Sequence, residues 1–434
     1  MRDTIYALSS APGRAGVAVV RLSGPAAGTV LEALTGKPLP PPRRARPARL
    51  MDRTGAAIDD ALVLWFAAPA SFTGEDVAEF HLHGGRAILD ALFAALADRP
   101  GLRPAEPGEF TRRAVENGKL DLTRAEAIAD LIDAETESQR RQALRQYEGA
   151  LARMCEDWRA RLVAAAAWIE AGIDFADEEL PDGLGVASEA KLRDILQEIQ
   201  SVLKDAHKGE IVRSGVHLTL FGEVNAGKSS LLNALARRDV AIVSPTPGTT
   251  RDVIEVRLDL GGYAVIVSDT AGLRTGTDAI EAEGVRRALE RARSADVAVL
   301  VADGTVSLPA PLPSDVVPDL IVWNKSDLAW PVPHDGLRVS AKTGAGLDRL
   351  LESLSKIVAQ KLDTQGIFPS LTRERHRHAL AAVATHLALA LKVREPELVA
   401  EELRMALRGL GRITGRVDIE ELLDVVFRDF CIGK

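Results

Sequence analysis

The side chains most suited to chemistry are concentrated between residues 222 and 342. The segment GEVNAGKS at 222–229 follows an apolar run and precedes a helical pattern, which is the context that a phosphate-binding loop requires. Its glycines let backbone N–H groups face a phosphate, and the N-terminus of the next helix adds its dipole. We expect Lys228 to reach the β- and γ-phosphates and the Ser229 hydroxyl to bind Mg²⁺. The segment therefore predicts a nucleoside triphosphate site.

Two downstream segments complete the phosphate and magnesium part of this site. The segment DTAG at 269–272 follows a strand pattern, so Asp269 can hold Mg²⁺ through water and the Gly272 N–H can bind the γ-phosphate. The segment PGTT at 247–250 offers the Thr250 hydroxyl as a second protein ligand. Mg²⁺ prefers octahedral oxygen coordination with few protein ligands, which Ser229, Thr250 and phosphate oxygens supply.

A third group of residues is suited to select the base. Asp327, in the segment NKSD at 324–327, is placed to accept hydrogen bonds from the N1–H and amino group of guanine. Adenine would leave this carboxylate unpaired, and sites of this kind reject such a ligand by about 10⁴-fold. The segment SAK at 340–342 offers a backbone N–H to the guanine carbonyl, so we predict GTP rather than ATP. The expected GTP contacts are Asn225, Ala226, Gly227, Lys228, Ser229, Ser230, Ser244, Thr246, Gly248, Thr249, Thr250, Asp269, Thr270, Ala271, Gly272, Asn324, Lys325, Asp327, Ser340, Ala341 and Lys342.

The residue that orients the attacking water has two candidate interpretations. Many small GTPases place a glutamine directly after the DxxG motif, but here that position is Leu273. The nearest downstream carboxylate is Glu281. It either holds the water from a loop folded over the phosphate or belongs to a solvated, acid-rich helix start. The residues alone assign no arginine finger.

The pattern of expected strands and helices around these motifs changes along the chain. Strand patterns at 17–22, 61–66 and 77–82 and helical patterns at 88–97 and 110–117 indicate a small α/β domain first, with the Pro-rich segment 38–49 as a surface loop.

Helical sequence patterns follow this domain. Thr123 and Glu126 form a capping-box signature, and apolar residues from Leu144 to Ile169 at three- and four-residue steps predict one long helix. Further one-sided helical patterns lie at 192–203, 380–391 and 418–430, and Pro396 opens another helix.

The predicted fold class is multidomain, α/β and all-α. Helices with a single apolar face before and after the middle of the chain must bury each other, which makes the middle an insertion into a helical bundle. The middle alternates strands and helices, as in a parallel sheet covered on both faces. The predicted segments are an N-terminal domain at 1–118, helical parts at 119–214 and 358–434, and a P-loop G domain with a parallel-type sheet at 215–357.

Composition limits the function classes. The chain has 434 residues, a formal charge of −8 and 4% aromatic residues, so no overall basic field attracts nucleic acid. Cys155 and Cys431 make no disulfide framework, which suits a reducing cytosol. The start has no signal-peptide core and the apolar runs are strand-sized, so we expect a cytoplasmic protein without membrane association.

The whole set of motifs resembles one family, the bacterial tRNA modification GTPases MnmE, also called TrmE. The likeness runs over nearly the whole chain, and the terminal FCIGK at 430–434 is a very specific part of it. The other matching segments are GRAG at 13–16, VRLSG at 20–24, SFTGED at 71–76, HGG at 83–85, PGEF at 107–110, KLDL at 119–122, AEAIADLID at 125–133, IDF at 173–175, DEE at 177–179 and GTTRD at 248–252.

The resemblance implies a folate-binding and dimerising N-terminal domain, a discontinuous helical domain and an inserted G domain. It implies a homodimer whose G domains associate with K⁺, which replaces an arginine finger. The K⁺ ligands by this likeness are the side chain of Asn225, the region of Thr249 and the carbonyls of Ser244 and Thr246. The likeness also favours Glu281 as the catalytic residue, acting through a bridging water.

The family's reaction adds an aminomethyl or carboxymethylaminomethyl group to C5 of the wobble uridine, U34, of certain tRNAs. It requires a reduced folate (5-formyl- or methylene-tetrahydrofolate) and the FAD-dependent partner MnmG, with which a heterotetramer or larger assembly forms. The folate contacts implied by the likeness are Arg21, Glu79, Lys119 and Lys434, with Cys431 as a contact residue.

Two other interpretations start from the same residues. A GTP-dependent ribosome-assembly or translation factor could carry the same G domain, but the −8 charge and few aromatics do not favour its RNA-binding module. A folate-dependent transferase could carry a degenerate G domain, but intact Lys228, Ser229 and Asp327 argue against decay.

Overall fold

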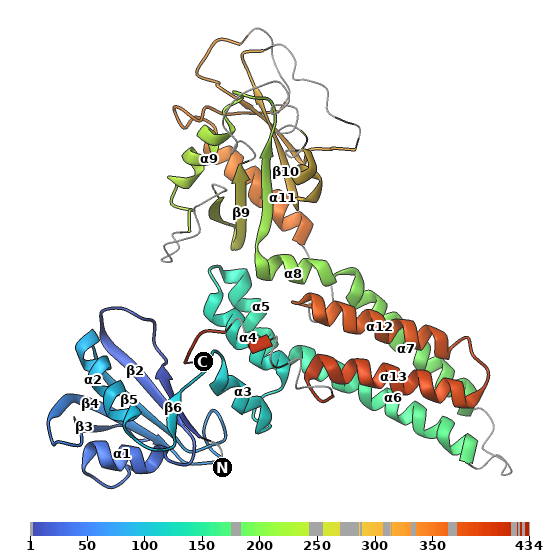
Figure 1. The fold of residues 1–434 in the computed structure, drawn as a ribbon. Helices are drawn as coiled ribbons and strands as arrows, with labels where there is room; N and C mark the ends of the chain where they lie inside the picture. Colours follow the sequence, from blue (N-terminus) through green and yellow to red (C-terminus); the bar gives the residue numbers. More distant parts are fainter. Residues whose placement is uncertain are drawn as a thin grey trace. The chain divides into compact units, whose positions relative to one another are not determined.

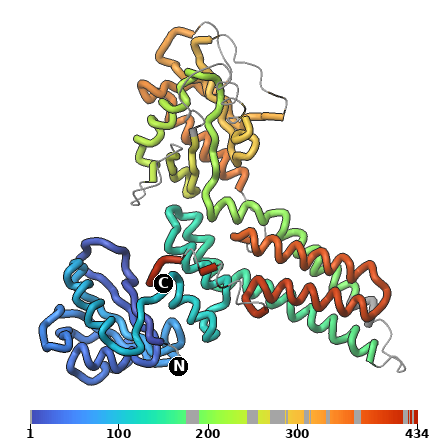
Figure 2. Tube along the Cα trace, viewed as in Figure 1, coloured from blue at the N-terminus to red at the C-terminus, as the bar shows by residue number. Residues whose placement is uncertain are grey.

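The computed structural model describes residues 3–174, 184–242, 255–269, 286, 289–306, 313, 315–330, 336–362, 371–417, 423, 426–427 and 430–433 (Figures 1 and 2). Contacts divide the chain into two units. The first unit contains Met1–Ala129, Cys155–Arg159 and Leu407–Lys434, and the second contains Asp130–Met154 and Ala160–Ala406. The predicted boundaries at 118, 214 and 357 remain predictions.

The first unit is built on a six-stranded sheet in the order β3-β4-β5-β2-β1-β6. Its neighbours are antiparallel except β1 and β6, which are parallel. Side chains alternate between its faces, so Phe80 and Trp65 enter the core with α1 and α2, while Arg21 and Glu79 lie on the other face. The elements are β1 (Thr4–Leu8), β2 (Ala15–Ser23), α1 (Ala27–Thr35), β3 (Arg46–Met51), β4 (Ala57–Phe66), β5 (Val77–Gly84), α2 (Arg86–Ala97), β6 (Leu102–Pro104) and α3 (Glu109–Glu116).

The predicted strands in this unit are confirmed, but the predicted loop at 38–49 is partly wrong. Its last four residues, 46–49, form the start of β3 and pair with β4, with Pro47 opposite Leu62. Proline is tolerated there because β3 is the edge strand and one side of its backbone has no ladder to join.

The C-terminal tail is attached to the first unit. Ile432 forms a β-bridge with Pro107, the Gly108 N–H donates to the Cys431 carbonyl at 3.3 Å, and the Ser9 hydroxyl donates to the Gly433 carbonyl at 3.0 Å. A Cβ on Gly433 would lie 2.0 Å from the Leu8 carbonyl oxygen. Only glycine therefore fits this position without displacing β1.

Two predicted helix boundaries are wrong for local reasons. α4 (Leu122–Asp133) begins before Thr123, and Asp121 accepts the Arg124 N–H at 3.1 Å in place of the predicted capping box. The predicted single helix across 144–169 is divided into α5 (Glu137–Tyr147) and α6 (Ala150–Asp174). Gly149 between them has φ of 85°, a left-handed conformation that ends the first helix.

In the second unit, helices from both sides of the insertion pack together, as predicted. α7 (Leu184–Lys204) packs against α12 (Glu374–Ala390) (Figure 2). Ile195 and Ile199 of α7 and Val383 of α12 are buried. The Thr372 hydroxyl donates to Gln146 at 2.7 Å across 226 positions of sequence. The other helices of the helical part of the chain are α8 (Ala206–Ser214) and α13 (Pro396–Thr414). Of the third predicted helix, residues 418–422 lie outside the described part of the chain.

The inserted sheet has the order β12-β11-β10-β7-β9-β8. Its strands are parallel, as predicted, except β8, which pairs antiparallel with β9 at the edge. Because parallel strands share a carboxyl edge, the carboxyl ends of β7, β9, β10 and β11 lie at one edge of this sheet. The elements are β7 (Val216–Phe221), α9 (Lys228–Ala236), β8 (Glu255–Leu260), β9 (Tyr263–Asp269), β10 (Val297–Asp303), β11 (Leu320–Asn324), β12 (Leu337–Arg338) and α11 (Leu347–Leu362).

The turn between β8 and β9 rests on α5. The Ser138 N–H donates to the Gly262 carbonyl at 3.0 Å, and Arg257 on β8 pairs with Glu135 at 2.8 Å. The described helices include none long and apolar enough to span a bilayer.

Candidate functional site

The loop after β7 has the backbone of a phosphate cradle. Gly222, Asn225 and Gly227 all have positive φ, at 140°, 63° and 90°. A Cβ on Gly222 would lie 2.2 Å from the Val301 carbonyl oxygen, and one on Gly227 would lie 2.2 Å from Asn324 Nδ2. Both glycines are therefore required by neighbouring strands as well as by the turn.

The functional side chains of this loop follow at the start of α9. Lys228 is buried, and its Nζ donates to the carbonyls of Gly222 at 3.0 Å and Glu223 at 2.8 Å. The ammonium therefore sits inside the loop whose amides can face a phosphate. Ser229 and Ser230 lie in the first turn of α9, where the helix dipole favours an anion.

Asn324 joins the phosphate loop to the two segments suited to select the base, 324–327 (the base-selecting segment) and 340–342. Its Nδ2 donates to the Ala226 carbonyl at 2.9 Å, and its Oδ1 accepts the Ala341 N–H at 3.0 Å. One buried amide thus ties together the phosphate loop, the end of β11 and the 340–342 segment. The bond to Ala226 spans 98 positions of sequence and the bond to Ala341 spans 17, so three separate segments meet at one residue.

Asp327 is held beside this junction as an ionised acceptor. The Ser340 hydroxyl donates to Asp327 Oδ1 at 2.6 Å. This hydrogen bond is the main cause that lowers the pKa of Asp327 below its ordinary value, and nearby Lys342 acts in the same direction. An ionised carboxylate is acceptor-only, which suits the adjacent N1–H and amino donors of guanine.

The structure also shows an anchor for Lys325 that the sequence did not indicate. Lys325 Nζ contacts Asp303 Oδ2 at 2.5 Å, and the Thr305 hydroxyl donates to Asp303 Oδ1 at 2.7 Å. Burial acts to raise the pKa of Asp303, but the hydrogen bonds from Lys325 and Thr305 outweigh it and the pKa is lowered. The end of β10 therefore restrains the base-selecting segment.

Part of the predicted site lies outside the described residues. Asp269 ends β9 as expected, but its side chain is not described. The predicted roles of these residues stay predictions. The others that lie outside are Ser244, Thr246, Gly248, Thr249, Thr250, Thr270, Ala271, Gly272 and Glu281.

A second polar group lies on the face of the first unit's sheet that faces away from α1 and α2. Arg21 Nε donates to Glu79 Oε1 at 2.9 Å, and the Arg21 guanidinium lies 5.5 Å from the Phe72 ring and 5.8 Å from the Phe110 ring. Lys119 Nζ donates to the Pro69 carbonyl at 3.0 Å. Lys434 is outside the described residues, although Gly433 before it is bound to Ser9.

Comparisons with known proteins show which family the chain is related to. The chain matches the MnmE helical domain over residues 122–431 and the N-terminus of the GTP-binding protein TrmE over residues 4–119. The chain belongs to the MnmE family. It is 57% identical to the tRNA modification GTPase MnmE of Paramagnetospirillum magneticum and 56% identical to that of Parvibaculum lavamentivorans, with 100% of each chain covered.

Among solved structures, one similar to this MnmE family member is the G domain of the T. maritima FeoB iron transporter. It is 26% identical and covers 33% of this chain and 98% of its own, with a TM-score of 0.24.

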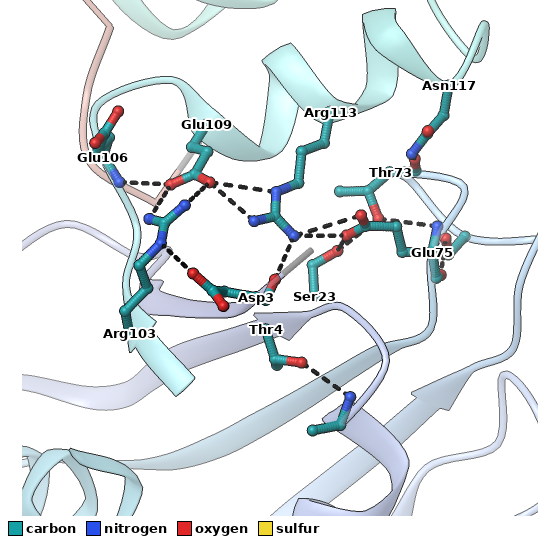
Figure 3. A network of polar contacts seen from close by, with 12 residues as sticks. Asp3, Thr4, Ser23, Thr73, Glu75, Arg103, Glu106, Glu109, Arg113 and Asn117 are labelled. Atoms are coloured by element: carbon teal, nitrogen blue, oxygen red, sulfur yellow. Dashed lines mark hydrogen bonds and ion pairs between the residues drawn. The ribbon is translucent and has the colours of Figure 1, made fainter. Parts of the chain in front are cut away.

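A buried ionic network in this MnmE family member joins α3 to Glu75 (Figure 3). Glu75 lies three positions after Phe72, in the loop between β4 and β5. Arg113 on α3 contacts Glu109 at 2.9 Å and Glu75 at 3.1 Å, and Arg103 contacts Glu109 at 2.6 Å. Burial acts to raise the pKa of Glu109, but the hydrogen bonds from Arg103, the Glu106 N–H and Arg113 outweigh it and the pKa is lowered. This network could not be predicted from the sequence, because each charge alone resembles an ordinary surface residue.

Proposed function

We propose that the chain is a K⁺-activated GTPase that acts in tRNA modification. With the FAD-dependent partner MnmG it adds an aminomethyl or carboxymethylaminomethyl group to C5 of U34, using a one-carbon folate. The observation that carries the GTPase assignment is the junction at Asn324, which joins a phosphate cradle to a carboxylate suited to guanine. The tRNA assignment rests on the family and on its full-length relatives.

In this proposal the chain's own residues bind and orient GTP. Lys228 and the α9 amides hold the phosphates, Asp327 and the 340–342 segment hold the base, and Glu281 orients water. Ser229 and Thr250 would hold Mg²⁺, which neutralises charge on the phosphates. Ser229 fits this role because it lies in the first turn of the helix that faces them.

The same loop suits a monovalent cation. Asn225 is exposed at φ of 63°, so its amide oxygen is accessible beside the phosphates, and Ser244, Thr246 and Thr249 would supply the other ligands. K⁺ held there would neutralise charge that develops on the phosphates, as an arginine does.

The sheet face of the first unit that carries Arg21 and Glu79 suits folate and a second copy of the chain. Glu79 can accept from pterin amino groups, and Arg21, Lys119 and Lys434 can pair with the glutamate tail. Leu62 on β4 pairs with His81 and is exposed on the same face, and Val17 on β2 is also exposed. We propose that homodimerisation covers this face and that the protein works in the cytoplasm.

GTP turnover is expected to be on the order of tenfold or more faster in K⁺ than in Na⁺ at matched ionic strength, because Na⁺ fits a set of long carbonyl contacts poorly. Asn225→Gly should remove this difference without backbone strain, since glycine accepts the positive φ. Val224→Ala, at an exposed neighbour, is the matched control. Equal rates in the two salts would reject K⁺ activation.

The modification activity is tested by reconstitution. The purified chain, MnmG, GTP, K⁺ and methylene-tetrahydrofolate should convert unmodified tRNA to a product with a C5 substituent at U34, detected by nucleoside mass spectrometry. Omission of the folate and a Lys228→Ala chain should each prevent it. An inert complete mixture that still hydrolyses GTP would reject the tRNA reaction and leave the GTPase assignment intact.

A further inference from the structure

The indole of Trp330 is hydrogen-bonded to the backbone of the base-selecting segment. Its Nε1–H donates to the Lys325 carbonyl at 3.1 Å, and the Leu328 N–H donates to the same carbonyl at 3.0 Å. The Lys325 backbone has φ of 66°, in the left-handed region that few residues other than glycine adopt. Two hydrogen bonds on one carbonyl hold this unusual conformation in place.

The indole is itself fixed by two strand ends. A Cβ on Gly304, directly after β10, would lie 2.2 Å from Trp330 Cε2, so the ring packs against the bare backbone of Gly304. The guanidinium of Arg338 on β12 lies 4.7 Å from the Trp330 ring centroid, within cation–π distance. The indole therefore has little freedom to move away from Lys325.

These contacts complete the restraint of the segment between Asn324 and Asp327. Asn324 is tied to the phosphate loop, Asp327 is tied to Ser340, and Lys325 is tied through its side chain to Asp303. The bond from Trp330 fixes the backbone between the first and the last of these anchors. A change of backbone at Lys325 would alter the direction in which the Asp327 carboxylate points.

We propose that Trp330 is a positioning residue for guanine recognition, which fixes the backbone at Lys325 and thereby aims the Asp327 carboxylate at the N1–H and amino group of the base. The inference deepens the proposed function and rests on Asp327 as the guanine acceptor. Its consequence is selective. The base-specific part of the affinity depends on Trp330, while the phosphate contacts of Lys228 and α9 do not.

The test compares GDP with IDP, whose base lacks the amino group, by calorimetry on the full chain. Trp330→Phe keeps an aromatic ring and removes the N–H, so GDP affinity should fall about fivefold, the value of one hydrogen bond. Trp330→Ala removes both contacts and should cost about tenfold or more. IDP should lose less in both variants, so the ratio of GDP to IDP affinity falls. In turnover assays the rise in KM for GTP should exceed the fall in kcat.

Gly304 offers an independent perturbation of the same contact. Gly304→Ala places a methyl group where the indole lies, so it should weaken GDP binding about as much as Trp330→Ala. The double variant should bind GDP no more weakly than Trp330→Ala alone, because the indole is already gone. Trp168→Phe, at a tryptophan that is 47% exposed on α6, is the control and should bind GDP as the unchanged chain does.

The outcomes separate this inference from the proposed function. Asp327→Asn should exchange guanine preference for xanthine, because an asparagine N–H can donate to the carbonyl that replaces the amino group; retained guanine preference would reject the Asp327 contact itself. If that exchange occurs but the Trp330 variants bind GDP normally, or lose GDP and IDP equally, the positioning role is rejected. Should Trp330→Ala fail to fold, Trp330→Phe decides by the same ratio.

Discussion

Replacement of Glu281 by Ala is expected to reduce GTP turnover in K⁺ on the order of 10²-fold or more while GTP affinity stays close to that of the unchanged chain. A carboxylate that orients the attacking water contributes in the transition state and makes little contact with the bound nucleotide, so its loss appears in kcat rather than in binding. Single-turnover hydrolysis and equilibrium binding of a slowly hydrolysed GTP analogue measure the two quantities separately.

Glu283 provides the matched control for this prediction. It has the same side chain, lies two positions further along and has no assigned role, so Glu283→Ala should leave turnover within about twofold. Unchanged turnover in Glu281→Ala would return Glu281 to the alternative interpretation, a solvated residue in an acidic helix start. Loss of GTP binding together with turnover would assign it to nucleotide binding and contradict the catalytic role.

The nucleotide site could be predicted from sequence because its chemistry depends on short contiguous segments. Gly227, Lys228 and Ser229 act through backbone conformation and a helix start, both of which local residues determine. The parallel arrangement of the strands followed from apolar runs that alternate with helical patterns, whereas their order in the sheet is known only from the structure. The shared carboxyl edge of parallel strands brings Asn324 and Asp327 beside the loop. The base-selecting motif and the phosphate motif were thus placed by a general property of parallel sheets.

Features that depend on tertiary contacts could not be predicted in this way. The break between α5 and α6 needs a left-handed Gly149, whereas the apolar spacing from Leu144 to Ile169 continues across it. The strand β3 was hidden by the prolines that precede it, because only its edge position makes Pro47 acceptable. Trp330 carries no motif, and its role emerges only when the ends of β10 and β11 are adjacent.

The ionic network of the first unit is a further feature that could not be predicted from the sequence. Arg113→Met is expected to destabilise that unit by about 3–5 kcal/mol. Methionine has similar length but cannot pair, so Glu75 loses a partner, and Glu109 loses one arginine and keeps Arg103 and the Glu106 N–H (Figure 3). Hydrogen exchange of the β1, β2 and β5 amides in the full chain measures the effect on this unit alone.

The controls for this prediction use both a surface pair and a conservative change. Arg112→Met breaks a half-exposed pair with Glu116 on the same helix and should cost about 1 kcal/mol or less. Arg113→Lys keeps the charge but loses the forked geometry, so its protection should lie between the two. Equal protection in the Arg112 and Arg113 variants would show that the network adds nothing beyond an ordinary surface contact.

The pH dependence of the same network follows from the lowered pKa of Glu109. Because the folded-state pKa lies below the ordinary value of 4.5, the contribution of Glu109 is fully present above that value and is lost as the pH falls through the folded-state pKa. Arg113→Met removes one of the partners that lower this pKa, so amide protection of the variant should fall less between neutral and acidic pH than that of the unchanged chain. A fall of the same size in both would show that the paired arginine does not set the ionisation of Glu109, and the loop that carries Phe72 beside Arg21 would then owe its position to apolar contacts.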